Sequence, residues 1–415
     1  MSNYRKRIPY GMMNFVDVRK DNCYFVDKTR FIPTMEQANK FFFFIRPRRF
    51  GKSLTLSMLK HYYDVLAKDK FEELYGELYI GQYPTEERNS YLIIQLNFSV
   101  IDAGLNNYRK SMDAHCNTVF NYFCDIYADY LPQGLKEGMN QKNGAVEQLD
   151  YLYRECAKHD LKIYLFIDEY DHFTNKILSD PHCLKEYQDE THGTGYLRTF
   201  FDTIKAGTDS SIKRCFVTGV SPVTMDDLTS GFNIGTNYST SPEFNELVGF
   251  TEQDVREMLD YYRTTADFHH TTDELIEIMK PWYDNYCFAE ESYGRTTMYN
   301  SCMVLYFVDN YIRSGCEIPK RMMYPDVDLD NEVIRKYILT MKNHPHAIQM
   351  LELLKQEGKV LDSLERDYRK NPYNDPYSFG RILFSWGLLT IIGKRRGYYE
   401  LTIPNQTAYH ILLKD

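Results

Sequence analysis

Short apolar runs alternate with amphipathic stretches over the first 250 residues of the chain. Four of these runs have the length and composition of strands covered on both faces, at residues 41–45, 91–98, 163–167 and 214–218. The segments between them predict a loop at residues 133–144 and helices at residues 53–66, 107–130, 146–158 and 196–205. Because strands that alternate with helices form parallel sheets, we predict an α/β domain. We expect a fifth strand at residues 244–248.

The pattern becomes helical after Phe250. Thr251 and Asp254 resemble a capping box in which Asp stands for the usual Glu, and helices are predicted at residues 255–262 and 275–283. Near the end, a helix at residues 377–386 precedes a hairpin with strands at 387–392 and 398–403 and a tip at 393–397. Helices followed by a hairpin resemble a winged helix. We therefore expect a core at residues 1–250, a helical subdomain at 251–345 and a winged-helix-like region at 346–415.

Composition narrows the class of protein. The 415 residues include 49 basic and 58 acidic side chains, so the net charge is −9 and any nucleic-acid contact needs a local basic patch. Nine cysteines without a Cys-x-x-Cys pair argue against a disulfide framework and a cysteine zinc site. No apolar run approaches the roughly 20 residues that span a bilayer, and the N-terminus lacks the apolar segment of a signal peptide. We expect a cytoplasmic protein without membrane contact.

The segment after the first strand carries a phosphate-binding signature. Gly51, Lys52 and Ser53 match the end of the P-loop pattern Gly-x-x-x-x-Gly-Lys-Ser/Thr, between a strand and a helix. In such a loop, backbone N–H groups at a helix N-terminus face phosphate oxygens, the Lys reaches the β and γ phosphates, and the hydroxyl binds Mg²⁺. Arg46 stands where the pattern has its first Gly, and Pro47 fixes φ beside it. Taken alone, this segment also fits an exposed strand–helix turn.

Two carboxylates, Asp168 and Glu169, follow the third strand. The carboxyl ends of parallel strands form the sheet edge at which ligands bind. There Asp168 can support the Mg²⁺ shell, and Glu169 can polarise the attacking water as a general base. A strand between the two motifs, as at residues 91–98, is what ATPases with a catalytic Glu after the Asp require. The alternative is an Asp-Glu pair that caps a helix.

The fourth strand ends with Thr218, and Ser221 follows shortly after it. A polar residue at this position would lie between the two motif strands and could contact the γ-phosphate or the attacking water. We take Thr218 or Ser221 as the candidate sensor. The alternative is that Thr218 only closes the strand and that Ser221 begins a helix.

Together these segments resemble the bacterial AAA-ATPase-like family, whose usual sequences read V-D-K-T, R-P-R-R-F-G-K-S, I-D-E-Y-D and T-G-V-S. The matching residues here are 26–29, 46–53, 167–171 and 218–221. The resemblance continues through Gly-Phe-Thr at 249–251 and through residues 282–288, which are similar to W-Y-N-G-Y-x-F but have Asp284 and Asn285 instead. Residues 295–300 are similar to the family's R-x-Y-N segment. The resemblance covers about residues 8–300, and R-P-R-R-F-G-K-S is rare elsewhere.

The resemblance implies an ATPase of the additional-strand, catalytic-Glu P-loop class, with ATP and Mg²⁺ as ligands. In this family Arg46 is the usual replacement for Gly. Carried onto this sequence, the metal residues are Ser53 and Asp168, and the catalytic residues are Lys52, Glu169, Thr218 and Ser221. The nucleotide-binding segment comprises Arg46, Arg48, Arg49, Phe50, Gly51, Lys52, Ser53 and Leu54. The arginines could pair with phosphates, or they could form a surface cluster that pairs with acidic residues.

Many family members continue past an Ile-Pro-Asn segment into a PD-(D/E)XK nuclease-like domain. Here that segment is Ile403 to Asn405, and no Asp followed by Glu-x-Lys comes after it, so we expect no nuclease. The expected function is Mg²⁺-dependent ATP hydrolysis. The alternatives are a STAND-like nucleotide switch or scaffold with little turnover, and the ATPase subunit of a DNA-processing system.

The sequence also suggests two kinds of macromolecular partner. Relatives of the switch class suggest a protein partner or a homo-oligomer. Contact with DNA would fall on the basic hairpin tip, at Lys394, Arg395 and Arg396, although a solvated basic turn explains the same residues.

Overall fold

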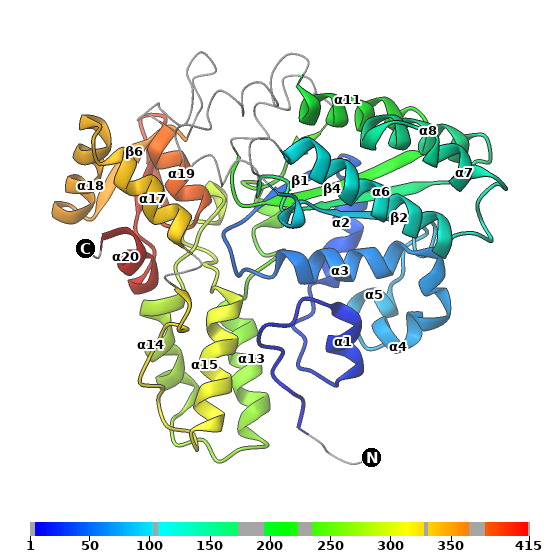
Figure 1. Cartoon of the computed structure of the whole chain (residues 1–415). Coiled ribbons are helices and arrows are strands. Elements are labelled where there is room, and N and C mark those ends of the chain that lie inside the picture. The colour runs from blue at the N-terminus through cyan, green and yellow to red at the C-terminus, as the bar shows by residue number, and fades with distance from the viewer. Residues whose placement is uncertain are drawn as a thin grey trace. The chain divides into compact units, whose positions relative to one another are not determined.

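A computed structural model describes residues 5–102, 107–172, 195–222, 235–327, 331–364 and 378–413. The chain forms two compact units, and Figure 1 shows the course of the backbone through them. The first unit comprises residues 1–31, 46–57 and 239–415, and the second comprises residues 32–45 and 58–238. The segment 46–57, which contains the Gly-Lys-Ser turn, therefore clusters with the C-terminal part of the chain.

The second unit is built on a parallel sheet with the strand order β2-β3-β4-β1-β5. Its strands are β1 (Phe41–Ile45), β2 (Leu92–Asn97), β3 (Ile163–Asp168), β4 (Ile212–Gly219) and β5 (Thr236–Asn237). The parallel α/β prediction and its first four strands are confirmed. Each of these strands consists mainly of buried apolar side chains, which explains why the pattern of apolar runs found them.

The expected fifth strand at residues 244–248 is wrong. That region contains the 3₁₀ helix Pro242–Phe244, and the fifth strand is the short β5. Pro242 fixes φ and lacks an N–H for a sheet ladder, so it favours the turn. Phe244, Leu247 and Val248 are buried without belonging to a strand, and their burial explains the misleading apolar run.

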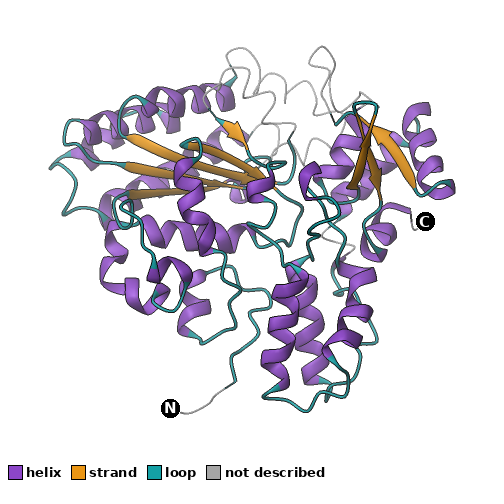
Figure 2. Ribbon diagram, turned by 180° about the vertical axis from the view of Figure 1, so that it is seen from behind, coloured by secondary structure: helices purple, strands orange, loops and turns teal. Residues whose placement is uncertain are grey.

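Helices cover both faces of the parallel sheet. Figures 1 and 2 show α6 (Tyr108–Ile126), α8 (Gly144–Ala157) and α11 (Tyr196–Thr208) on one face. On the other lies the end of α3 (Lys52–Tyr63), where the Tyr63 ring packs 5.0 Å from that of Tyr164 in β3. The unit also contains α2 (Ile32–Gln37), the 3₁₀ helix Val65–Lys70, α4 (Phe71–Tyr75) and α5 (Tyr79–Gln82).

The loop expected at residues 133–144 is partly wrong, because α7 (Leu135–Asn140) lies within it. Gly134 adopts a φ of 81° at the start of this helix. Leu135 and Met139 are both buried, and the spacing of four residues places them on one helical face. Two apolar anchors in a polar, glycine-containing stretch were too few to reveal the helix.

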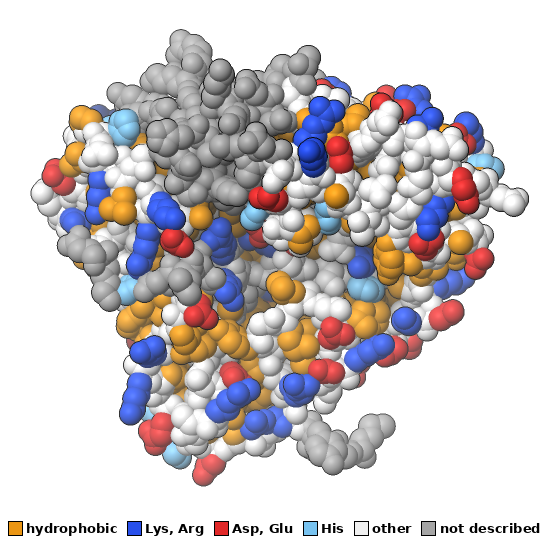
Figure 3. Space-filling view, in the orientation of Figure 1, with side chains coloured by type: hydrophobic (Ala, Val, Ile, Leu, Met, Phe, Trp, Pro, Cys, Tyr) orange, Lys and Arg blue, Asp and Glu red, His pale blue; other side chains and the backbone are white. Residues whose placement is uncertain are grey.

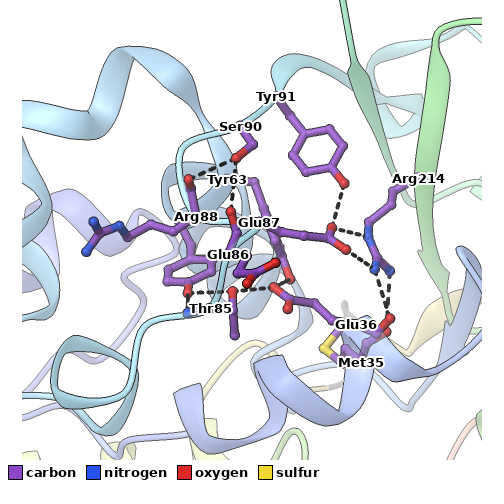
Figure 4. A network of polar contacts seen from close by, with 11 residues as sticks. Met35, Glu36, Tyr63, Thr85, Glu86, Glu87, Arg88, Ser90, Tyr91 and Arg214 are labelled. Atoms are coloured by element: carbon purple, nitrogen blue, oxygen red, sulfur yellow. Dashed lines mark hydrogen bonds and ion pairs between the residues drawn. The ribbon is translucent and has the colours of Figure 1, made fainter.

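A buried polar network joins the start of β4 to α2 and to the segment before β2 (Figure 4). The Arg214 guanidinium donates to both carboxylate oxygens of Glu87, from Nε and from Nη2, at 2.6 Å each, and Nη2 also donates to the Glu36 carbonyl at 2.9 Å. Tyr91 donates its hydroxyl to the same Glu87 carboxylate at 2.5 Å. The network fixes the edge of the sheet at which β4 begins.

The first unit contains the helical region. The capping box predicted for Thr251 and Asp254 is confirmed at the start of α13 (Glu252–Arg263), and a second one at Thr271 and Glu274 begins α14 (Thr272–Tyr283). Figure 1 shows these helices beside α15 (Ser301–Arg313). Further helices are α1 (Phe15–Lys20), α17 (Glu332–Met341), α18 (Pro345–Gln356), α19 (Phe379–Ser385) and α20 (Gln406–Leu413).

A three-stranded antiparallel sheet, in the order β6-β8-β7, completes the first unit (Figure 2). Its strands are β6 (Lys359–Asp362), β7 (Thr390–Arg395) and β8 (Tyr398–Thr402). The predicted five-residue tip is too long. Lys394 and Arg395 belong to β7, and the turn consists of Arg396 and Gly397, whose φ angles are 53° and 87°. Two residues with positive φ form the compact turn that suits a twisted hairpin.

Among the described residues, no helix combines the length and the apolar character that crossing a membrane requires.

Candidate functional site

The phosphate-loop segment follows β1 directly and ends at the N-terminus of α3. Gly51 has a φ of 94° and Arg49 a φ of 69°, so the chain turns sharply before the helix. Thr55 N–H donates to the Gly51 carbonyl at 3.0 Å, which is the first hydrogen bond of the helix. The N–H groups of the first helical turn have no intrahelical acceptor, and the helix dipole places partial positive charge there. This end of α3 is therefore suited to an anion.

Lys52 is buried, and its side chain folds back across the loop. Its Nζ donates to the carbonyl of Arg46 at 3.0 Å and to that of Pro47 at 2.9 Å. The loop is thus curled around the ammonium group, which holds a positive charge beside the helix N-terminus. Ser53, the next residue, is half-buried and carries the hydroxyl expected to bind Mg²⁺.

Two of the side chains expected at the nucleotide are buried inside the first unit. The Arg46 guanidinium donates to the carbonyls of Ser239 and, at 3.2 Å, Phe244, and it lies 4.3 Å from the centre of the Phe288 ring. Phe50 packs edge-on against Phe288 at 5.5 Å. Burial lowers the pKa of Arg46 to about 9, so the guanidinium still carries its charge at neutral pH. These two side chains therefore hold the loop against Ser239, Phe244 and Phe288 rather than facing solvent.

The other two arginines of the segment are more accessible. Arg48 is half-buried, and Arg49 is exposed with its guanidinium 4.8 Å from the centre of the Tyr324 ring. Their backbone carbonyls are held by the region around the start of α15: Asn300 donates to Arg48 and Ser301 to Arg49, at 3.3 and 3.2 Å.

The acidic end of β3 belongs to the second unit. Asp168 is the last residue of the strand and is buried, and its Oδ1 accepts the N–H of Glu169 at 3.0 Å. Glu169 is half-buried and has a φ of 53°, a conformation that costs a non-glycine residue about 1 kcal/mol. Backbone strain of this kind is concentrated at functional positions. The chain therefore bends at the residue expected to act as the general base.

Thr218 and Ser221 lie at the end of β4 and just beyond it, and both are buried. The Thr218 hydroxyl donates to the carbonyl of Phe44 in β1 at 2.8 Å, so its hydrogen is directed at the neighbouring strand and its lone pairs remain for a donor. Ser221 N–H donates to Asp171, and the Ser221 carbonyl accepts the Tyr170 hydroxyl. The two candidate sensors are thus fixed by the segments beside them.

Asp171 is the functional candidate that sequence reasoning missed. Its Oδ2 accepts the N–H groups of Val220 and Ser221, which ties the chain after β3 to the chain after β4. Burial first, and the Glu169 charge second, raise the pKa of Asp171 to about 7. The second Asp of the Asp-Glu-Tyr-Asp run was the available signal, but a periodic pattern does not tell a buried carboxylate from a solvated one.

The pairing of residues between neighbouring strands shows how the sheet arranges the candidate site residues. Ile45 at the end of β1 pairs with Gly219 of β4, and Val217 of β4 pairs with Ile167 of β3. The carboxyl ends of β1, β4 and β3 therefore lie along one edge, and the strand with the sensor candidates separates the other two. The expectation that the fourth strand ends between the two motif strands is confirmed.

Near the N-terminus, the Val-Asp-Lys-Thr segment contacts α13. Lys28 is buried and forms an ion pair with Asp254 at 2.6 Å, and Asp254 also accepts the Thr251 N–H in the capping box. Asp27 caps the 3₁₀ helix Thr29–Phe31 by accepting from the N–H and the hydroxyl of Thr29. The Lys28–Asp254 ion pair could not be predicted from local sequence, because the two residues lie 226 positions apart.

The basic hairpin is less positive than its sequence suggests. Lys394 forms an ion pair with Glu290 at 2.8 Å, and the hydrogen bond to the Glu290 carboxylate raises the pKa of this lysine. On the face drawn in Figure 3, acidic and basic side chains are interspersed over the described surface. Arg395 and Arg396, both exposed, are the remaining basic groups of the hairpin.

These features define a P-loop α/β protein: a Gly-Lys-Ser turn follows one parallel strand, and an Asp-Glu pair ends another. A family model described as AAA-ATPase-like, predicted AAA-ATPase, matches residues 9–229, which is more than half of the chain. The chain belongs to this family.

One curated relative is an uncharacterized protein in the vnfD 5′ region of Azotobacter chroococcum. It is 27% identical over 256 residues, which cover 60% of this chain and 44% of the relative. The chain therefore spans less than half the length of that protein.

Two solved structures resemble the chain more distantly. They are Cdc6p from Pyrobaculum aerophilum and the ORC2 protein of Aeropyrum pernix, with 12% and 11% identity and TM-scores of 0.32 and 0.36. Each likeness covers 99% of this chain and 94% of the other. Both TM-scores are below 0.5.

Proposed function

We propose that the chain binds ATP with Mg²⁺ and hydrolyses it. The observation that carries the proposal is the buried Lys52 ammonium, which the carbonyls of Arg46 and Pro47 hold beside the N-terminus of α3. A fixed positive charge and the N–H groups of a first helical turn together match the β and γ phosphates of a nucleotide.

The remaining roles follow from the chemistry of each side chain. Ser53 and Asp168 offer a hydroxyl and a carboxylate, the oxygen ligands that Mg²⁺ accepts beside phosphate oxygens, and the metal would neutralise charge on those phosphates. Glu169 takes the proton of the attacking water. Thr218 and Ser221 respond to the γ-phosphate at the end of β4. Arg48, Arg49 and the backbone of residues 50–54 line the phosphates.

Titration of purified protein with ATP and MgCl₂ in a calorimeter tests binding. Lys52→Ala is expected to weaken ATP binding by roughly 2–5 kcal/mol, the cost of removing one member of a desolvated charge pair. Lys60→Ala is the matched control, because Lys60 lies in the same helix and donates to Gln95 instead. ATP affinity that is equal in wild type and Lys52→Ala would show that the loop does not bind phosphate.

A nucleotide-dependent switch with little turnover is the second candidate. It is favoured by the contacts of the loop carbonyls with Asn300 and Ser301, which offer a path from the nucleotide to the helical region. Steady-state phosphate release separates the two functions: an ATPase turns over repeatedly, whereas a switch retains its nucleotide. Both the ATPase and the switch would act on a protein partner or through self-assembly. Native mass measured with and without ATP tests self-assembly.

A further inference from the structure

We propose that Arg46 is a positioning residue that anchors the phosphate loop to the C-terminal part of the first unit, with Phe288 as the surface on which it rests. The proposal deepens the proposed function and rests on it. It also assigns a role to the arginine that stands in place of the first glycine of the P-loop pattern.

The first support is the position of the Arg46 side chain. The whole residue is 1% exposed, although arginine is rarely buried without partners. Its Nη1 and Nη2 donate to the carbonyls of Ser239 and Phe244, and its Cζ lies 4.3 Å from the centre of the Phe288 ring. A guanidinium can make two directional bonds and a cation–π contact together, whereas an ammonium group cannot match that geometry. The site is therefore built for arginine.

The second support is the direct connection between Arg46 and Lys52. The Arg46 carbonyl is one of the two loop acceptors of the Lys52 ammonium. A side chain that holds Arg46 in place consequently holds an acceptor that orients the phosphate-binding lysine. A glycine at position 46 would leave this acceptor without a side-chain anchor and would increase the freedom of the backbone.

The third support is that Phe50, at the other end of the loop, also packs against Phe288. The Phe50 ring packs edge-on against Tyr286 at 4.9 Å and against Phe288 at 5.5 Å, and the Phe50 carbonyl accepts the Gly249 N–H at 2.9 Å. Gly249 has a φ of 80°, and a Cβ there would come within 2.9 Å of the Phe50 ring. Phe288 thus contacts the side chains at both ends of the loop, and it belongs to the segment similar to the family's W-Y-N-G-Y-x-F.

The test compares Arg46→Gly, which restores the usual P-loop glycine, with wild type and Arg46→Lys. We expect Arg46→Gly to bind ATP at least tenfold more weakly than wild type and Arg46→Lys to be intermediate. Phe288→Leu should also weaken ATP binding. The double variant Arg46→Gly/Phe288→Leu should lose less binding free energy than the sum of the two single losses, because both changes remove the same Arg46–Phe288 contact.

Leu259→Ala is the control for a purely structural effect. Leu259 is a fully buried residue of α13, so its truncation lowers the melting temperature while leaving the loop contacts intact. We expect its ATP affinity to equal that of wild type. The proposal is overturned if Arg46→Gly binds ATP as wild type does, or if Leu259→Ala weakens ATP binding as much as Arg46→Gly.

A second measurement needs no nucleotide. Hydrogen exchange over residues 46–54, followed by mass spectrometry in the absence of ATP, should be faster in Arg46→Gly than in wild type and in Leu259→Ala. Equal exchange in all three proteins would overturn the proposal. Wild-type protein that fails to bind ATP would overturn the proposed function instead, and the exchange rates would still decide whether Arg46 anchors the loop.

Discussion

The Arg214–Glu87 pair predicts an asymmetric loss of stability when either partner is removed (Figure 4). The Arg214 side chain is 4% exposed and that of Glu87 is 32% exposed. Glu87→Met therefore leaves a buried guanidinium without its carboxylate, whereas Arg214→Met leaves a carboxylate that water can reach. The partner left behind decides the cost.

The expected magnitudes follow from that difference. Removing one partner of a buried pair costs about 3–5 kcal/mol, and we expect Glu87→Met to fall in this range. Losing hydrogen bonds to a charged group that regains water costs less, about 1–3 kcal/mol, which we expect for Arg214→Met. The double variant should lose less than the sum of the two single losses, because no charge is then left unpaired.

Urea denaturation followed by far-UV circular dichroism measures these losses. Glu86→Met, which replaces an exposed neighbouring carboxylate, should change the free energy of unfolding by less than about 0.5 kcal/mol. An Arg214→Met loss that equals or exceeds the Glu87→Met loss would refute the burial argument. Strictly additive losses in the double variant would refute the pairing.

The same pair gives a pH dependence with a definite sign. Burial alone would raise the pKa of Glu87, but the hydrogen bonds from Arg214 and Tyr91 and the Arg214 charge outweigh it and lower the pKa. The stability that Glu87 contributes is therefore complete above the pKa of an unfolded glutamate, about 4.3, and is lost as the pH falls through the lower folded value. The wild-type advantage over Glu87→Met should be constant from pH 6 to 8 and shrink in stronger acid.

Two further predictions concern chemistry and partners. Glu169→Gln should bind ATP but release phosphate about 10²–10⁴-fold more slowly, because an amide cannot accept the proton of the water. Glu137→Gln, which changes an exposed carboxylate, is the control and should match wild type. Turnover of Glu169→Gln within about threefold of wild type would exclude Glu169 as the base. Binding of duplex DNA by the hairpin should show a log–log salt slope of about −1.8, from two phosphate contacts, because Lys394 is paired with Glu290. Filter binding should then disappear on Arg395→Ala/Arg396→Ala and persist in Lys394→Ala, and binding that survives the double substitution would place the DNA contact elsewhere.

Local sequence patterns predicted the parts of the fold that depend on local chemistry. The strands β1 to β4 are runs of buried apolar residues, and Thr251 with Asp254 forms its capping box within four residues of chain. The fourth strand was expected to end between the two motif strands, and β4 does pair with both β1 and β3. Two predictions were wrong where the sequence pattern is ambiguous. The helix α7 has only two buried apolar residues in a polar stretch, and the apolar run around Phe244 is buried but is not a strand.

Side-chain direction was not accessible in the same way. Arg46, Arg48 and Arg49 look equivalent in the sequence, yet Arg46 is buried, Arg48 is half-buried and Arg49 is exposed. The difference is made by Ser239, Phe244 and Phe288, which lie about two hundred or more positions away in the chain. Asp171 is a similar case, because its burial depends on the turn after β4 rather than on its own neighbours.

The replacement of glycine by arginine at position 46 then has a physical explanation. A P-loop glycine usually supplies backbone freedom, and here Gly51 and Arg49 already take the positive φ angles that the turn requires. Position 46 therefore does not need a glycine, and its long side chain is buried against Ser239, Phe244 and Phe288. Because this side chain joins the loop to those three residues, nucleotide bound at Lys52 and the packing of Phe288 would act on the same short segment. Under the proposed function, such a loop would couple nucleotide binding directly to the C-terminal part of the first unit.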